Sequence, residues 1–230
     1  MDRTPGPLES SSAEAVRRAG HPGPELQPHG PDGEGLRARV WRLAPGTLAV
    51  SSAPLGGGIG PCGWVVNAQV PHSYDRRDPA EHLRRLAAGY GLRGPGVGML
   101  TAVDVRHIWS AEDDGVVADV SVGITWPTWA AAPDELATAP LGAAGPAVAG
   151  ATGRAPSPPG TINVVALVPA RLSPAALVNA AMTVTEAKAQ ALWEAGVAAT
   201  GTASDAVCVA CPAGGEEEPF GGPRSHWGAR

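Results

Sequence analysis

Hydrophobic residues recur along the chain in two patterns, which together predict an α+β fold. Short apolar runs bounded by Gly, Pro or Asp indicate strands. The expected strands cover residues 39–43 and 47–52 (a pair of strands or one hairpin), 63–70, 97–105, 115–124, 161–168 and 205–211. Because these strands and the helices do not alternate strictly, we expect mixed sheets in layers packed with helices.

Two helices are predicted from their N-terminal residues. Asp78 is a good N-cap and is followed by a proline and by an acidic residue three positions later, as in a capping box. The helix after it should end by about residue 91. Ser173 caps a longer helix, which we expect to stop at Gly196.

The domain organisation follows from where this periodicity is missing. Residues 1–35 are rich in Pro, Gly, Ser and His and predict a disordered tail. Residues 36–230 predict a single domain, interrupted by an Ala/Gly/Pro-rich flexible insertion at 130–159. The last residues, 225–230, are typical of the first turn of a helix, so we expect a truncated C-terminus.

Charge and hydropathy exclude several classes of function. The net charge is −5, without a run of Lys or Arg, which argues against nucleic acid and against an anionic membrane surface. No apolar run approaches the about 20 residues that span a bilayer. The N-terminus lacks the apolar segment of a secretory signal, so we expect a cytoplasmic protein. The oligomeric state is not predictable from these features.

Cysteine and histidine positions argue against redox and metal chemistry. The three cysteines are an odd number, which fits a reducing compartment. Cys208 and Cys211 form a CxxC, but they lie on an alternating strand, where residues an odd number apart face opposite ways. Only a bend near Pro212 would bring the thiols together. The six histidines form no HxH, HxxxH or HExxH, so we expect no zinc site.

One lysine is out of place on the long helix. At about 100° per residue, Lys188 projects from the middle of an apolar stripe. The side chain either extends along the apolar surface to solvent or has a catalytic role. In catalysis it would stabilise an oxyanion as a cation, or accept a proton as a neutral base. Glu186 falls on the polar face and is expected to be solvated, unless a groove between layers recruits it. The stripe consists of Leu177, Ala181, Val184, Ala191, Leu192 and Ala195.

Four further segments are candidates for a site. The hydroxyl-rich residues 200–205 end in Asp205, and they either orient a substrate or form ordinary turns. Thr161 begins a buried strand after the insertion, where an N-terminal-nucleophile hydrolase places its nucleophile; alternatively it only begins the strand. The Gly-rich loop 56–60 matches neither a Walker loop nor a dinucleotide fingerprint, yet a large ligand can approach it closely. Trp126 and Trp129 stack on a planar ligand or cap a core edge.

Seven segments together resemble the adenosylcobinamide amidohydrolase family. The resemblance extends from about residue 43 to 227, apart from the insertion. The segments are SSAPLGGGIG (51–60), WVVNAQVP (64–71), VGMLTAVDV (97–105), GVVADVSVGITWP (115–127), GTINVVALV (160–168), AAMTVTEAKAQAL (180–192) and TGTASDAVCVACP (200–212).

The resemblance implies hydrolysis of the aminopropanol amide of adenosylcobinamide to adenosylcobyric acid, in corrinoid salvage. It implies a small-molecule corrinoid substrate and no metal or organic cofactor for catalysis, because the cobalt belongs to the substrate. The catalytic candidates are Lys188, Thr161, Glu186 and Asp205. The residues expected to bind substrate are Gly57, Gly58, Asn67, Asn163, Thr183, Thr185, Thr200, Thr202 and Trp126.

A fainter similarity concerns mechanism. The segment that begins at Thr161 is similar to the start of the β-subunit in the D-aminopeptidase and ornithine acetyltransferase group, whose members cleave themselves before a Ser or Thr nucleophile. By this analogy Thr161 attacks the amide, its amine or Lys188 takes the proton, and backbone N–H groups hold the oxyanion. Three alternatives stay open: attack by water activated by Glu186 or Asp205, an N-terminal-nucleophile amidase acting on another amide, and a corrinoid-binding protein without turnover.

Overall fold

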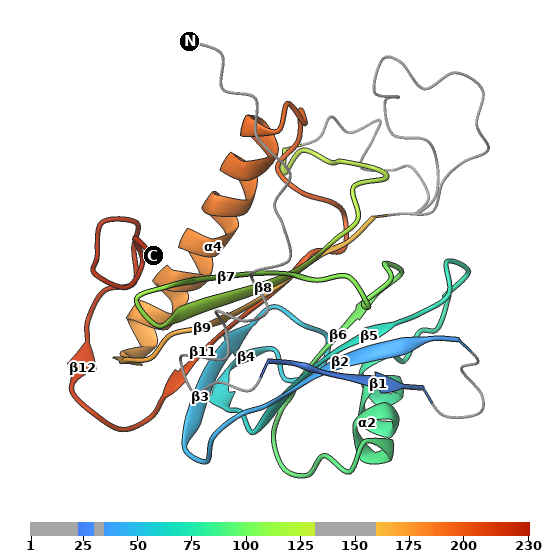
Figure 1. The fold of residues 1–230 in the computed structure, drawn as a ribbon, viewed down its shortest axis with the longest axis horizontal. Coiled ribbons are helices and arrows are strands. Elements are labelled where there is room, and N and C mark those ends of the chain that lie inside the picture. Colours follow the sequence, from blue (N-terminus) through green and yellow to red (C-terminus); the bar gives the residue numbers. More distant parts are fainter. Residues whose placement is uncertain (1–22, 30–34, 132–159) are drawn as a thin grey trace.

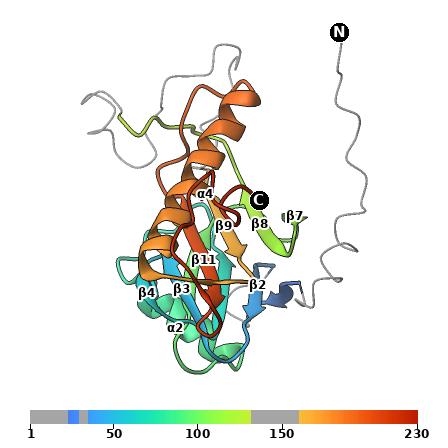
Figure 2. The same cartoon turned by 90° about the vertical axis from the view of Figure 1, so that its left-hand side faces the viewer.

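Two sheets pack face to face, and each carries one long helix on its outer side (Figures 1 and 2). The structure is a computed structural model that describes residues 23–29, 35–131 and 160–230. The strands of the six-stranded sheet are, in spatial order, β4 (Gly58–Pro61), β3 (Thr47–Ser51), β11 (Ala206–Pro212), β9 (Ile162–Leu167), β8 (Val116–Val122) and β7 (Trp109–Asp113).

The second sheet has four strands, in the order β1 (Glu25–Pro28), β2 (Arg37–Arg42), β5 (Trp64–Gln69) and β6 (Val97–Thr101). Helix α2 (Pro79–Gly89) covers its outer face, and α4 (Pro174–Glu194) covers part of the outer face of the six-stranded sheet. Two short strands, β10 (Arg171–Leu172) and β12 (Glu217–Glu218), form a separate parallel pair. The predicted α+β class is confirmed.

Both sheets are mixed, and one parallel pair positions the site. β9 and β11 run parallel and adjacent, with Asn163 opposite Ala206. β8 and β3 flank them in antiparallel orientation. Because β9 has a sheet on one side and a helix on the other, all six of its residues are buried, as its continuous apolar run predicted.

The hydrophobic core is divided among the three interfaces between the four layers. Val65, Met99, Val165 and Cys208 belong to the cluster between the two sheets. Leu177 packs in the cluster between α4 and the six-stranded sheet. On the opposite outer side, α2 contributes buried leucine and alanine side chains against the four-stranded sheet.

Several strands differ from the sequence prediction. β2 and β3 belong to different sheets, so the hairpin alternative is wrong. β1 and β7 were not predicted, because their residues are mostly exposed and lack an apolar alternation. Part of the Gly-rich loop forms β4, and β6 ends at Thr101 rather than at residue 105. Residues 25–28 lie within the predicted disordered tail, yet they form β1 and pair with β2. The rest of the tail and insertion predictions concerns mainly residues 1–22, 30–34 and 132–159, which lie outside the described residues.

Both predicted helices form, with different N-termini. The Ser173 hydroxyl accepts a hydrogen bond from the N–H of Ala176 at 3.0 Å and so caps α4 as expected. Asp78 does not cap α2, because its carboxylate pairs with Arg76 at 2.7 Å instead. Gly196 follows α4 at φ +75°, the left-handed conformation that ends a helix.

The C-terminal residues and the cysteines complete the comparison. Residues 225–229 form a single helix-type turn, as the sequence predicted: the N–H of Ala229 donates to the carbonyl of Ser225 at 3.2 Å, and the N–H of Gly228 donates to the Ser225 hydroxyl at 3.0 Å. Cys208 faces the core between the sheets and Cys211 faces α4, so the predicted separation of the two thiols is confirmed. Within the described part of the chain, no helix combines the length and apolar character needed to cross a membrane.

Candidate active site

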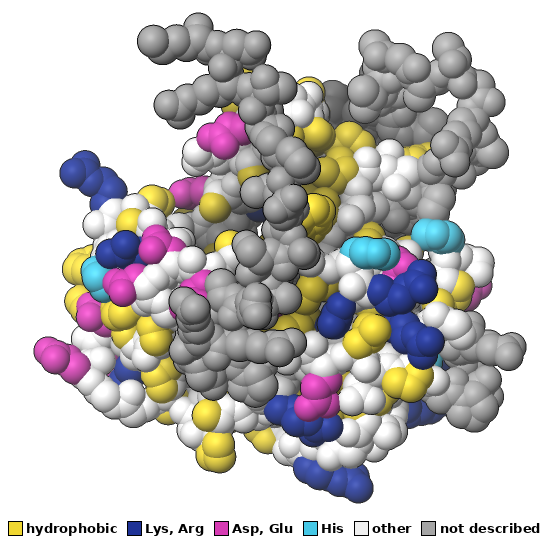
Figure 3. Space-filling view, viewed as in Figure 1, with side chains coloured by type: hydrophobic (Ala, Val, Ile, Leu, Met, Phe, Trp, Pro, Cys, Tyr) yellow, Lys and Arg dark blue, Asp and Glu magenta, His cyan; other side chains and the backbone are white. Residues whose placement is uncertain are grey.

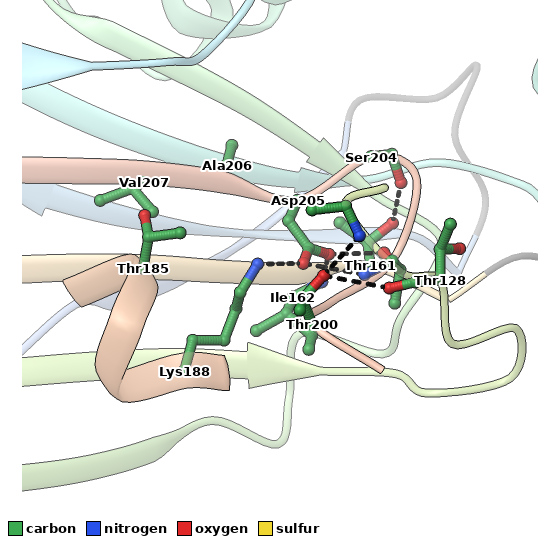
Figure 4. A network of polar contacts seen from close by, with 12 residues as sticks. Thr128, Thr161, Ile162, Thr185, Lys188, Thr200, Ser204, Asp205, Ala206 and Val207 are labelled. Carbon is green, nitrogen blue, oxygen red and sulfur yellow. Dashed lines mark hydrogen bonds and ion pairs between the residues drawn. The ribbon is translucent and has the colours of Figure 1, made fainter. Parts of the chain in front are cut away.

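The polar residues gather where the N-terminal ends of β9 and β11 meet the C-terminal half of α4 (Figure 4). Thr161 directly precedes β9 and Asp205 directly precedes β11. Since the two strands are parallel neighbours, both residues lie at the same end of the sheet. Lys188 reaches this end from α4.

The carboxylate of Asp205 is surrounded by donors. Lys188 Nζ lies 2.6 Å from Oδ2, and the N–H of Ile162 donates to Oδ1 at 2.8 Å. Thr202 donates twice, from its backbone N–H at 2.9 Å and from its hydroxyl. Because these donors occupy the acceptor positions of the carboxylate, Asp205 is placed to orient other groups rather than to accept a proton.

Lys188 is largely removed from solvent. Its side chain is 13% exposed and that of Asp205 is 9% exposed. A lysine on the apolar stripe was predicted, and the structure shows that it ends in an ion pair rather than in solvent. An ammonium has three N–H donors, and Asp205 is its one acceptor among the described residues. Two donors therefore remain for a ligand.

The loop around this ion pair has no room for a further side chain. A Cβ at Gly201 would overlap both Asp205 Oδ2 and Lys188 Nζ. The close approach of the 201 backbone therefore requires glycine.

A pair of hydroxyls lies beside the ion pair. Thr161 Oγ1 and Ser204 Oγ are 2.8 Å apart. Thr161 is only 4% exposed, whereas Ser204 is exposed. The sequence placed Ser204 in the hydroxyl-rich loop without identifying it, because nothing in the spacing shows which hydroxyl of that loop meets Thr161.

Two buried asparagines brace the strands that carry these groups. Asn163 accepts from the N–H of Ala206 at 3.1 Å and donates to the side chain of Asn67 at 2.9 Å. Asn67 in turn donates to Ser121 at 2.8 Å. Both asparagines are 2% exposed and lie between the sheets. Both side chains are occupied by contacts within the protein, and substrate binding by the two asparagines stays a prediction.

The loop after β8 is fastened to the loop that ends in Asp205. The N–H of Thr128 donates to Gly201 at 2.8 Å, and the N–H of Thr200 donates back to Thr128 at 3.1 Å. The hydroxyl of Thr200 accepts from the N–H of Ala130 at 2.8 Å. We call these contacts the Thr128–Thr200 clip. It holds the loop of Trp126 and Trp129 against the site.

Comparison with known proteins identifies the family. The model of the family described as adenosylcobinamide amidohydrolase matches residues 32–230. This chain belongs to the adenosylcobinamide amidohydrolase family. An adenosylcobinamide amidohydrolase from Methanosarcina mazei is 30% identical over 194 residues, which cover 80% of this chain and 84% of the relative. One from Halobacterium salinarum is 35% identical over 146 residues, 64% of this chain and 58% of the relative. No solved structure matches.

The family predicted from the sequence segments is thus confirmed, and the remaining predicted residues can be placed in this amidohydrolase. Glu186 is exposed on α4, and no hydrogen bond joins it to the Asp205 network within the described residues. Thr185 is exposed one turn before Lys188, and its hydroxyl donates to the backbone of its own helix. The Thr183 hydroxyl is occupied by two backbone carbonyls, including that of Gly221 at 2.9 Å.

The glycine loop lies at the same end of the six-stranded sheet as Asp205. Gly58 pairs with Ser51, whose hydroxyl donates to the carbonyl of Val207 at 2.9 Å. Gly57 precedes it, and a Cβ there would lie 2.7 Å from the carbonyl oxygen of Ala53. These two glycines therefore lie three strands from β9, with β3 and β11 in between, and they make no contact to the ion pair among the described residues.

An apolar cavity of about 440 Å³ opens beside Lys188, between α4 and strands β8 and β9. Its walls are mostly valine, alanine and isoleucine side chains. Across residues 23–29, 35–131 and 160–230, no three His, Cys, Asp or Glu side chains are grouped to hold a metal ion. Catalysis without a resident metal stays a prediction.

Proposed function

We propose that this chain hydrolyses the aminopropanol amide of adenosylcobinamide, releasing adenosylcobyric acid for corrinoid salvage. Family membership supports the reaction. The observation that carries the proposal is the Lys188 ammonium, held by Asp205 beside two hydroxyls and facing an apolar cavity. A buried, oriented cation can stabilise the oxyanion formed in amide cleavage, and a neighbouring hydroxyl can act as the nucleophile.

Lys188 stabilises the oxyanion in this proposal. Attack on an amide carbonyl places negative charge on its oxygen, and a preorganised donor lowers the energy of that state. The ion pair is largely desolvated, so its electrostatic interactions are stronger than in water. Asp205 keeps the ammonium in place, which makes it a positioning residue.

The attacking group is a hydroxyl of the Thr161–Ser204 pair. Its oxygen forms an ester with the acyl carbon, the C–N bond breaks, and its proton passes to the leaving aminopropanol nitrogen. Water then hydrolyses the ester and restores the hydroxyl. Direct attack by water activated by Glu186 or Asp205 is disfavoured, because Glu186 is exposed and the Asp205 carboxylate is already occupied. In the ester route the hydroxyl proton passes to the leaving nitrogen, so neither carboxylate has to accept it.

Two further parts of the proposal concern cofactor and compartment. We assign the cobalt to the substrate and no resident metal to catalysis. We also place the protein in the cytoplasm. Support comes from the three cysteines, which are free and buried, as expected in a reducing compartment.

The test is turnover of adenosylcobinamide by the purified chain. Adenosylcobyric acid and aminopropanol are followed by mass spectrometry together with the intact protein mass, with and without EDTA. We expect both products at equal rates in the two buffers. Lys188→Met should lower kcat by about 100-fold or more, the usual effect of removing an oxyanion donor, while corrinoid binding is kept. Binding without any product would instead indicate a corrinoid-binding protein.

A matched pair of variants identifies which of the two hydroxyls attacks the amide carbonyl. Loss of turnover in Thr161→Ala with retention in Ser204→Ala identifies Thr161, and the opposite result identifies Ser204. Unchanged turnover in both excludes the ester route. A chain split between Gly160 and Thr161 would show that Thr161 acts as an N-terminal nucleophile.

A further inference from the structure

The apolar stripe of α4 changes its surroundings along the helix. In the first half, Leu177 and Ala180 are buried against the six-stranded sheet. In the second half, Ala187, Ala191 and Ala195 are exposed and line the cavity. These three residues are four positions apart and so form one continuous ridge of small side chains. This ridge faces open space instead of core.

The opposite wall of the cavity is a sheet face that the helix does not reach. α4 packs on β11 and β3, which leaves the outer face of β8 without a helix in the described part of the chain. On that face Val122 is 37% exposed and Ile124 is 36% exposed. Figure 3 shows hydrophobic side chains gathered in the upper part of one face of the molecule, over the loop that follows β8.

The two walls meet at the catalytic groups. Lys188 lines the cavity one helical turn before Ala191. Leu192 also lines it and packs against Ile162, the residue that follows Thr161. A cavity of about 440 Å³ falls within the usual range for ligand pockets, which are apolar with a few placed polar groups. The polar side chains in its lining are those of Thr183, Lys188 and Arg230, and of these Lys188 belongs to the ion pair with Asp205.

We propose that this cavity binds the methyl-bearing edge of the corrin ring, so that the amide side chain extending from that edge reaches Lys188. The proposal rests on the function proposed above and names the substrate contact. Aminopropanol and the other amide side chains of the corrinoid would lose hydrogen bonds among valine and alanine side chains. A corrinoid is larger than the drug-sized ligands that fill such pockets, so only one edge enters and the rest stays outside.

The first test fills the cavity. Ala191→Phe places an aromatic ring in it, and Ala175→Phe puts the same ring on an exposed site in the first turn of α4, outside the cavity. We expect Ala191→Phe to raise KM for adenosylcobinamide at least tenfold, and Ala175→Phe to leave it unchanged. Thermal unfolding of both variants is measured alongside, to confirm that they are folded.

The second test changes the polarity of the wall. Val122→Glu introduces a carboxylate at a partly exposed position of the cavity, and Val178→Glu does so at a 46% exposed position on the outer side of α4. Only Val122→Glu should weaken corrinoid binding. A wild-type KM in either folded cavity variant overturns the proposal.

To separate binding from turnover, the cavity and control substitutions are also made in a Lys188→Met background. The dissociation constant of adenosylcobinamide is then measured for each variant by equilibrium dialysis. If the wild type releases no product but Ala191→Phe and Val122→Glu still weaken binding, the corrin contact stands and the proposed hydrolysis fails. If product is released and both cavity variants bind like the wild type, the hydrolysis stands and the corrin contact fails.

Discussion

At the scale of single residues, helical periodicity in the sequence identified one member of the site, Lys188. Several other members could not be identified in this way. Lys188 was predicted on the apolar stripe because helix geometry alone places it there. Its partner Asp205 precedes β11, so the ion pair depends on the packing of α4 on β11. The bond from Ile162 that holds Asp205 depends in turn on the parallel pairing of β9 with β11. Ser204 and the asparagine bridge depend on the same pairing and on the contact between sheets, which no local pattern encodes.

Gly201 gives a prediction at this scale. Gly201→Ala should lower kcat strongly and destabilise the fold by about 1–3 kcal/mol, because its Cβ overlaps the Lys188–Asp205 pair. Gly214→Ala is the matched control, since a Cβ there meets nothing within 4 Å. Turnover and thermal unfolding are measured for both. A wild-type kcat in Gly201→Ala would show that the loop at residues 200–205 shifts to accommodate the added methyl group without displacing the Lys188 ammonium.

At the scale of elements, strand positions were easier to predict than strand partners. The apolar runs located β5, β8, β9 and β11 to within a few residues. The short spacing between β2 and β3 suggested a hairpin, yet they lie in different sheets, where β2 pairs with β5 and β3 pairs with β11. β7 escaped prediction because it is an exposed edge strand.

The Thr128–Thr200 clip is the feature to test among the elements. Thr200→Val removes the hydroxyl that accepts from Ala130, so the loop with Trp126 and Trp129 should loosen. We expect KM for the corrinoid to rise about fivefold, equivalent to about 1 kcal/mol for one hydrogen bond, with a smaller change in kcat. Thr47→Val, which loses a comparable bond to Ala44, should show neither effect. Equal kinetics in the two variants would argue against the clip.

At the scale of the whole molecule, the layer order explains the chemistry of the cysteines. Cys208 lies in the middle interface and Cys211 in the outer one, so the strand itself separates them. Burial raises the pKa of the thiols of Cys62, Cys208 and Cys211. The sequence predicted the separation from strand alternation, but not the layers, because layer order depends on contacts between distant segments.

Thiol labelling tests this arrangement. A raised thiol pKa lowers the thiolate fraction at neutral pH, and burial blocks access, so iodoacetamide should leave all three cysteines unmodified in the native protein. All three should react after unfolding in guanidinium. A Ser73→Cys variant, at an exposed position, should be labelled in the native state. Native labelling of Cys208 and Cys211 would instead support redox chemistry.

The pairing of β3 with β11 also has a consequence for synthesis on the ribosome. β3 comprises residues 47–51, and its partner comprises residues 206–212, near the end of the chain. The four-stranded sheet is complete by residue 101, but the sheet that covers its inner face needs β9 and β11. The nascent chain therefore presents an apolar sheet face and an unpaired strand edge for most of its translation, which is the interval in which chaperones protect such surfaces. Catalytic competence arrives only after Asp205 and β11 (Ala206–Pro212) have been synthesised.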